Sequence, residues 1–184
     1  MLLITGSPGV GKTTIIRKVA ASLARRRLGG FFTREIRAGR ERRGFQLVTF
    51  DGREWLMAHA DIRGPHRLGK YGVDVAAVEA AASALAPGRA ELYLLDEIGR
   101  MECLSPAFVA AVRKLLDSPT TVVATVALRG DGLIAEVKQR ADTEIWTVTR
   151  ANRDDLPARV VAWLGEGVTS TAILRGAVTS RPGC

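Results

Sequence analysis

Nine residues near the N-terminus have the types and spacing of a phosphate-binding loop. They satisfy the pattern G-x-x-x-x-G-K-[ST] and read Gly6, Ser7, Pro8, Gly9, Val10, Gly11, Lys12, Thr13 and Thr14. Its three glycines allow backbone conformations that a Cβ would forbid, so that successive N–H groups can surround an anion. Lys12 would reach the β- and γ-phosphates of a nucleotide, and the Thr13 hydroxyl would bind Mg²⁺. The pattern predicts a nucleoside triphosphate site.

Two acids at 96 and 97 supply the second half of this chemistry. They follow the apolar run 92–95, which is typical of a buried strand. The carboxyl end of such a strand is where α/β sheets bind ligands. Asp96 would hold the Mg²⁺, directly or through water, and Glu97 would face the γ-phosphate and deprotonate an attacking water. Lys12 and Glu97 are therefore the predicted catalytic residues.

Two arginines are further candidates for nucleotide contacts. Arg153 follows the last predicted strand, so it should lie beside the phosphate loop, where its guanidinium could stack on a base of any kind. An exposed arginine at a helix start is an equally good interpretation. Arg100 follows the turn after Glu97 and is the arginine nearest in sequence that could stabilise charge on the γ-phosphate.

The elements that would position these residues alternate between strands and helices. We expect strands at 2–5, 31–37, 44–50, 54–58, 91–96, 120–126 and 144–149, and helices at 12–27, 74–85, 105–116, 133–140 and 152–164. The strand ending in the two acids is expected beside the strand that precedes the phosphate loop. The alternation predicts a three-layer α/β domain with a mostly parallel sheet, and the three strands between 31 and 58 predict an antiparallel hairpin insertion. Residues 1–165 form this one domain, and 166–184 are expected to be a disordered tail.

Composition limits the classes of partner and compartment. The net charge is +8, and residues 1–70 carry 15 Lys and Arg against 5 Asp and Glu. This asymmetry could attract nucleic acid, but no recognisable basic motif with interleaved aromatic residues accompanies it, so nucleic-acid binding is not favoured. No apolar run reaches the roughly 20 residues that a membrane span needs. Two distant cysteines, Cys103 and Cys184, predict a reducing compartment, and the cytoplasm is the expected location.

Several stretches together resemble one known family. Besides 6–14, they are 30–37, 43–45, 69–73, 96–102 and 149–153. They are similar to the small P-loop nucleoside-triphosphatase family that includes the thermophile nucleoside-triphosphatases and the human cancer-related nucleoside triphosphatase. The resemblance covers residues 1 to about 164 and implies a RecA-like P-loop domain that hydrolyses ATP, GTP and other nucleoside triphosphates with loose base selectivity. The family usually has lysine at the position of Arg100.

Two other activities remain open on the sequence alone. A small P-loop kinase would use the arginines at 34, 37, 40, 42 and 43 as a basic lid over the phosphates. Glu97 argues against it, because a kinase must exclude water from the γ-phosphate. A nucleic-acid-associated ATPase would use the basic first 70 residues. A signalling GTPase is disfavoured, because the chain lacks Asn-Lys-x-Asp to read guanine. A protein partner cannot be identified from these patterns.

Overall fold

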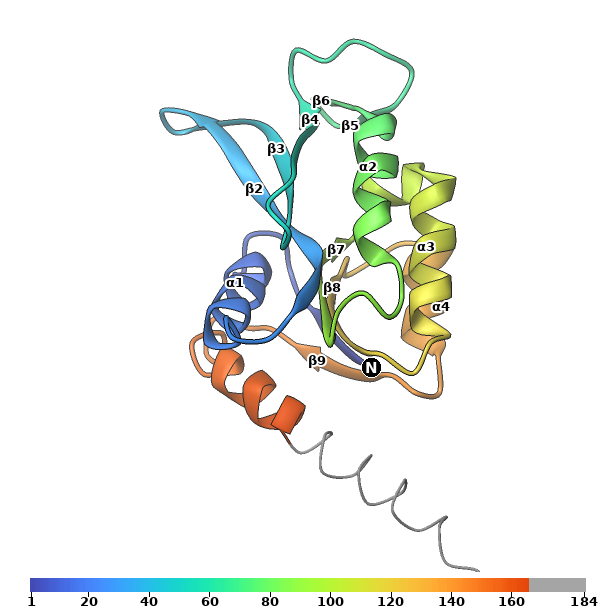
Figure 1. Ribbon diagram of the computed structural model, residues 1–184. Helices are drawn as coiled ribbons and strands as arrows, with labels where there is room; N and C mark the ends of the chain where they lie inside the picture. The colour runs from blue at the N-terminus through green and yellow to red at the C-terminus, as the bar shows by residue number, and fades with distance from the viewer. Residues whose placement is uncertain (166–184) are drawn as a thin grey trace, which may run out of the picture.

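The structure is a computed structural model that describes residues 1–165 of the 184-residue chain. Its elements in chain order are β1 (Leu2–Thr5), α1 (Lys12–Ser22), β2 (Leu28–Ala38), β3 (Glu41–Thr49), β4 (Glu54–His59), β5 (Arg67–Leu68), β6 (Tyr71–Val73), α2 (Val75–Ala82), the 3₁₀ turn η1 (Ser83–Leu85), β7 (Leu92–Ile98), the 3₁₀ turn η2 (Glu102–Leu104), α3 (Pro106–Leu116), β8 (Thr121–Val126), α4 (Leu133–Gln139) and β9 (Glu144–Thr147). A last helix covers residues 156–165. Figure 1 shows their arrangement.

The strands of this part of the chain form one sheet in the order β5-β6-β4-β3-β2-β7-β8-β1-β9. Every neighbouring pair from β2 to β9 is parallel, and every pair from β5 to β2 is antiparallel. The β2–β4 strands therefore extend the parallel sheet as a projecting ribbon (Figure 1). The predicted α/β class, with a mostly parallel sheet and an antiparallel hairpin insertion, is confirmed.

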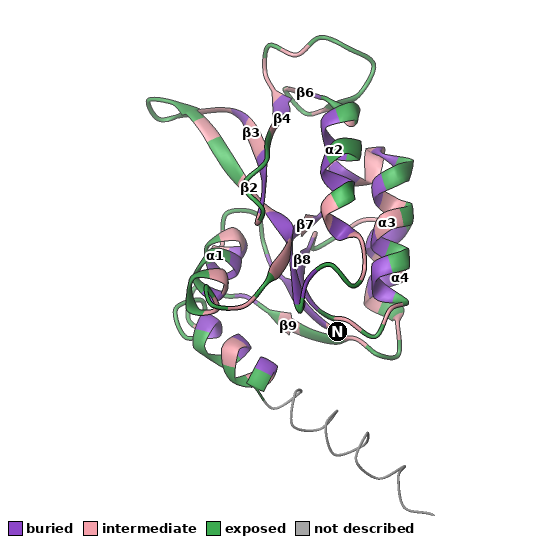
Figure 2. Cartoon of the chain, in the orientation of Figure 1, coloured by how far each residue is buried: buried purple, intermediate pink, exposed green. Residues whose placement is uncertain are grey.

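Helices cover both faces of the parallel strands and give the sheet two cores. One face carries α1 and the helix at 156–165, and the other carries α2, α3 and α4 (Figure 1). Side chains alternate between these cores along each strand, so Leu92 and Leu94 face α1 while Tyr93 and Leu95 face α3. The strands between the helices are accordingly buried on both sides (Figure 2).

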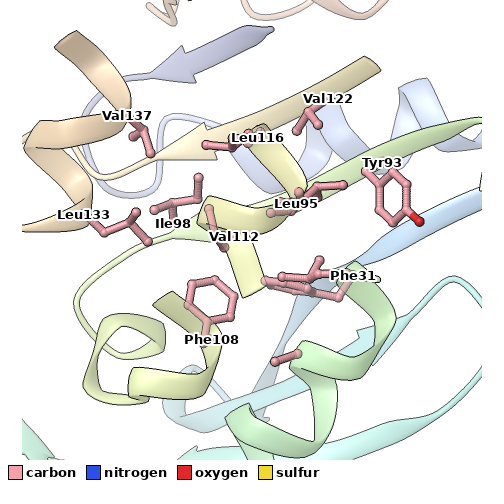
Figure 3. Packing of buried hydrophobic residues seen from close by; sticks show 14 of the residues in the cluster. Phe31, Tyr93, Leu95, Ile98, Phe108, Val112, Leu116, Val122, Leu133 and Val137 are labelled. Atoms are coloured by element: carbon pink, nitrogen blue, oxygen red, sulfur yellow. The ribbon is translucent and has the colours of Figure 1, made fainter. Parts of the chain in front are cut away.

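An aromatic pair lies in the larger core, between the sheet and α3 (Figure 3). The rings of Phe31 and Phe108 meet edge to face with centroids 5.9 Å apart, a geometry worth about 0.5–1.5 kcal/mol beyond burial. The N-terminal turn of α3 is fixed by Ser105, whose hydroxyl accepts a hydrogen bond from the Phe108 N–H at 3.1 Å. This cap and the proline at 106 start the helix at the predicted position.

The first helix is shorter than the sequence predicts. It ends at Ser22 rather than at 27, and the segment 28–30, which contains two glycines, is the start of β2. Here the glycines serve close packing within the sheet. A Cβ on Gly29 would lie 2.5 Å from the Tyr93 ring, and one on Gly30, where φ is +93°, would lie 2.1 Å from the Leu94 carbonyl oxygen. Helix-stop glycines and glycines needed for a close approach look alike in sequence.

The prediction that β7 lies next to β1 in the sheet is wrong. β8 lies between β7 and β1, so the strand with the acids does not pair with the strand of the phosphate loop. Five of the six β8 residues are buried, and such a run fits a central strand covered by helices on both faces. The two site strands therefore approach the nucleotide site from either side of β8.

Smaller differences concern loops and ends. The stretch 61–71, where no helix or strand is predicted, contains β5 and the start of β6. Residues 150–155 form turns, so the last helix begins at 156 rather than 152. The predicted tail, 166–184, lies outside the described residues. Within residues 1–165, no helix has both the length and the apolar character needed to span a membrane.

Candidate functional site

The predicted phosphate loop connects the carboxyl end of β1 to the first turn of α1. Gly11 is the N-cap of α1 with φ at +117°, a backbone conformation that suits glycine, and no side chain caps the helix. The first N–H groups of α1 therefore remain available to an anion, and the helix dipole favours negative charge at this point. Such an end is a phosphate-binding arrangement.

Two hollows flank the loop. The first has a volume of about 450 Å³ and is lined from the loop by Pro8, Gly9, Gly11, Lys12, Thr13 and Thr14. The second has a volume of about 740 Å³ and is lined from the loop by Gly6, Ser7, Pro8, Gly9 and Val10. Together the two sets contain all nine residues predicted for the loop. Pro8 and Gly9 line both hollows, so a nucleotide bound at the loop could extend into either.

Lys12 lies on the side of the first hollow and is 8% exposed. Its ammonium group donates a hydrogen bond to the Gly6 carbonyl oxygen at 3.1 Å, and it forms an ion pair with Glu97 Oε2 at 3.2 Å. The structure thus brings together the two predicted catalytic residues, which are 85 positions apart in the sequence.

Glu97 lines the same hollow, and its side chain is 30% exposed. Burial raises the pKa of Glu97 above its ordinary value, and the Lys12 ammonium partly opposes this effect. A carboxylate with a raised pKa is a stronger proton acceptor than an exposed one. Glu97 is therefore suited to accept a proton at the phosphate side of the loop.

Asp96 lies behind Glu97 and is 1% exposed. Its Oδ1 accepts a hydrogen bond from the Thr125 hydroxyl at 2.7 Å, and its Oδ2 accepts one from the Thr33 hydroxyl at 3.0 Å. Thr125 comes from β8 and Thr33 from β2, the two strands that flank β7. These neutral donors fix the carboxylate without neutralising its charge, so the charge remains available to a cation.

The donor set fits Mg²⁺. This ion prefers oxygen ligands, takes only one or two carboxylates from the protein, and keeps waters and substrate phosphates as its other ligands. Asp96 supplies a carboxylate that no lysine or arginine of the described chain pairs with, and Thr13 supplies a hydroxyl at the wall of the first hollow. Thr13 and Asp96 would hold the metal, with the loop holding the phosphates.

The two candidate arginines lie on opposite sides of the loop. Arg100 is exposed and lines the first hollow, next to Glu97. Arg153 lines the second hollow, and its Cδ lies 3.8 Å from the position that a Cβ on Gly11 would take. The Asn152 side chain holds this loop, because it accepts a hydrogen bond from the Thr149 N–H at 2.8 Å and donates one to the Thr147 carbonyl. The predicted position of the Arg153 loop is confirmed.

Three residues of the site were missed by the motif analysis. Thr33 and Thr125 hold Asp96, and Glu102 lines the first hollow beside Glu97. Thr125 could have been predicted, because it is a polar residue near the carboxyl end of a parallel strand and these ends lie at one edge of the sheet. No spacing rule connects these threonines to an aspartate on a third strand.

The chain is similar to known nucleoside-triphosphatases. The chain matches the NTPase family over residues 1–161. It is 39% identical to the nucleoside-triphosphatase THEP1 of Thermotoga maritima over 166 residues, covering 89% of this chain and 94% of that protein. It is 33% identical to the cancer-related nucleoside-triphosphatase of Homo sapiens over 179 residues, covering 87% and 94%.

Solved structures show the same likeness. The crystal structure of THEP1 from Aquifex aeolicus superposes with a TM-score of 0.76 at 31% identity, covering 89% of this chain and 99% of that one. The solution structure of a human cancer-related nucleoside triphosphatase gives the same TM-score at 33% identity, covering 89% and 96%. The match over residues 1–161 and the identity to these relatives show that the chain belongs to the NTPase family.

Proposed function

We propose that this protein is a Mg²⁺-dependent hydrolase of nucleoside triphosphates, which cleaves ATP, GTP and related nucleotides to the diphosphate and phosphate. The observation that carries this proposal is the position of Glu97, in the same hollow as the loop and in contact with Lys12. Its test is phosphate release from the four common nucleoside triphosphates, with and without Mg²⁺. Release that is independent of Mg²⁺, or confined to one base, would contradict the proposal.

In this proposal the ion pair between Lys12 and Glu97 breaks when a nucleotide binds. Lys12 turns to the β- and γ-phosphates, which leaves Glu97 Oε2 free to accept a proton from water. That water attacks the γ-phosphorus, the bond from the γ-phosphorus to the β–γ bridging oxygen breaks, and the nucleoside diphosphate leaves with the bonding electrons. When bound, Mg²⁺ would neutralise charge on the phosphate oxygens.

Loose base selectivity would follow from the second hollow. Arg153 lines this hollow together with Arg150, and a guanidinium stacks on any base without reading its edges. Arg153→Ala is expected to raise KM for all nucleotides by a similar factor, of about 5- to 30-fold for a loss of 1–2 kcal/mol. Steady-state kinetics with ATP, GTP, CTP and UTP measure this. A rise in KM for one base alone would indicate edge recognition instead.

Turnover by the isolated protein is expected to be slow. Phosphoryl transfer builds negative charge around the γ-phosphate, and fast hydrolases place an arginine there, from the same chain or from a partner. Arg100 is close in sequence to Glu97 but exposed, and neither an ion pair nor a hydrogen bond to a neighbouring side chain of the described chain holds it in place. We therefore expect a kcat below the enzyme median of roughly 10 s⁻¹.

Steady-state kinetics over a wide range of protein concentration test whether the isolated protein turns over slowly. A rate per protein molecule that rises with concentration would identify a neighbouring molecule as the source of the missing charge. Fast turnover that is independent of concentration and unchanged by Arg100→Ala would show that the site is complete without either source.

The structure weakens the two alternative functions. Four of the five hairpin arginines pair with acids of the same insertion: Arg34 with Glu54, Arg37 and Arg42 with Glu35, and Arg43 with Asp61. Such pairing is typical of a solvated surface and leaves less positive charge for a phosphate lid or for nucleic acid. Hydrolysis measured with and without RNA over a salt series separates the nucleic-acid alternative, which requires stimulation that salt removes.

A further inference from the structure

Glu102 is a buried acid that the proposed reaction does not use. It is the first residue of η2, five positions after Glu97, and it is 4% exposed. No ion pair of the described chain involves it, although it lines the hollow that holds Lys12 and Glu97. An acid without a cation in such a place needs a physical explanation, because burying an unpaired carboxylate is costly.

Glu102 and Glu97 converge on one small space above Gly99. A Cβ on Gly99 would lie 2.7 Å from Glu102 Oε2 and 3.1 Å from Glu97 Oε1. A side chain at this position would occupy the space that both carboxyl groups border. The other oxygen of Glu97, Oε2, is the one that pairs with Lys12. The two oxygens of Glu97 therefore face different partners.

The charge state of Glu102 follows from its surroundings. Burial raises its pKa to about 8, and the negative charges of Glu97 and Asp96 act in the same direction, while backbone hydrogen bonds at Gly99 and Glu102 lower it in part. The helices α2 and α3, whose buried residues are apolar, lie next to this turn. The raised pKa favours the protonated form of Glu102 at neutral pH, and this form can donate a hydrogen bond.

We propose that Glu102 is a positioning residue, a neutral carboxylic acid that donates a hydrogen bond to Glu97 Oε1 and fixes the Glu97 carboxylate for water activation. The need arises when a nucleotide binds. Lys12 then leaves Glu97 for the phosphates, and Glu97 loses the contact that holds it in the nucleotide-free protein. Glu102 keeps Oε1 in place while Oε2 accepts the proton. This inference rests on the role proposed for Glu97.

The kinetic test compares two substitutions at this position. Glu102→Gln keeps a neutral donor of the same shape, and its kcat at pH 7 is expected within about threefold of wild type. Glu102→Leu removes the donor, and its kcat is expected to fall by about 10- to 100-fold with KM nearly unchanged, because misplacing a catalytic group by about 1 Å has this effect. Cys103→Ala, in the same turn, is the matched control and should leave kcat unchanged.

The inference is overturned if Glu102→Leu keeps the wild-type kcat, or if Glu102→Gln loses as much activity as Glu102→Leu. The first result would make the residue purely structural, and the second would mean that the ionised form is required. If Glu102→Leu does not fold, the pH dependence of the Tm of Glu102→Gln relative to wild type tests the inference instead.

A second readout needs no nucleotide or metal. The folded-state pKa of about 8 lies above the ordinary 4.5, so the stability contributed by the neutral acid is complete below pH 4.5 and is lost as the pH rises to 8. The Tm of Glu102→Gln relative to wild type should therefore increase between pH 4.5 and 8. Cys103→Ala serves again as the control, since burial raises the pKa of that thiol to about 12, outside this range.

A Tm difference that does not change with pH would show that Glu102 is ionised in the fold and would overturn the inference. This result is independent of hydrolysis. Failure of the proposed function would appear separately, as a Glu97→Gln variant with normal turnover.

Discussion

Lys12→Ala is expected to abolish nucleotide turnover while leaving the fold intact. The ammonium group is the cation nearest to the predicted phosphate position, and it is held there by the Gly6 carbonyl oxygen and Glu97. Its removal leaves the charge that develops on the γ-phosphate without a partner in a largely buried site. Phosphate release measures the loss, and circular dichroism with thermal melting verifies the fold.

Lys18→Ala is the matched control, because this exposed lysine lies on the same helix, away from the hollow. It should retain wild-type turnover. A Lys12→Ala protein that also retained it would show that the loop at 6–14 does not bind the reacting phosphates.

Glu97→Gln is expected to lose hydrolysis by about 10²–10⁴-fold, the usual contribution of a general base. The amide has nearly the same shape, so Mg²⁺-nucleotide binding should be retained, and loss of the negative charge near the phosphates favours binding further. Asp96→Asn should behave differently: its turnover should need more Mg²⁺, because the carboxylate held by Thr33 and Thr125 is the proposed metal ligand. Single-turnover rates and Mg²⁺ titrations separate the two effects.

Glu91→Gln is the control for these acids, since Glu91 precedes the opposite end of β7 and pairs with Arg26 on the surface. It should leave hydrolysis unchanged. Turnover of Glu97→Gln within threefold of wild type would transfer water activation to another group.

The parts of the site that are formed by consecutive residues could be predicted from the sequence. The loop requires consecutive residues, so its pattern from Gly6 to Thr13 predicted a phosphate site and the helix that follows it, and the helix is confirmed. The acids at 96 and 97 were recognisable because they end a continuous apolar run. Helix starts were equally local, as at Ser105, whose cap and following proline are adjacent in sequence.

The rest depends on contacts through space. Nothing in the sequence of β8 says that it lies between β1 and β7, because two buried strands of similar composition can exchange places without changing their hydrophobic pattern. The hydrogen bonds from Thr33 and Thr125 to Asp96 follow from that order. The approach of Glu102 to Glu97 over Gly99 depends on the path of a short turn, for which hydrophobic periodicity gives no information.

The most direct test of the account is the stoichiometry of the reaction with ATP as the only substrate. ADP and inorganic phosphate are quantified together, with purified protein, in the presence of Mg²⁺ or of a chelator. The account predicts equal amounts of the two products with Mg²⁺, and neither product with the chelator or with Lys12→Ala. Nucleotide binding with no phosphate release, or ADP formed in excess of phosphate, would contradict it and would indicate that the γ-phosphoryl group is transferred to an acceptor other than water.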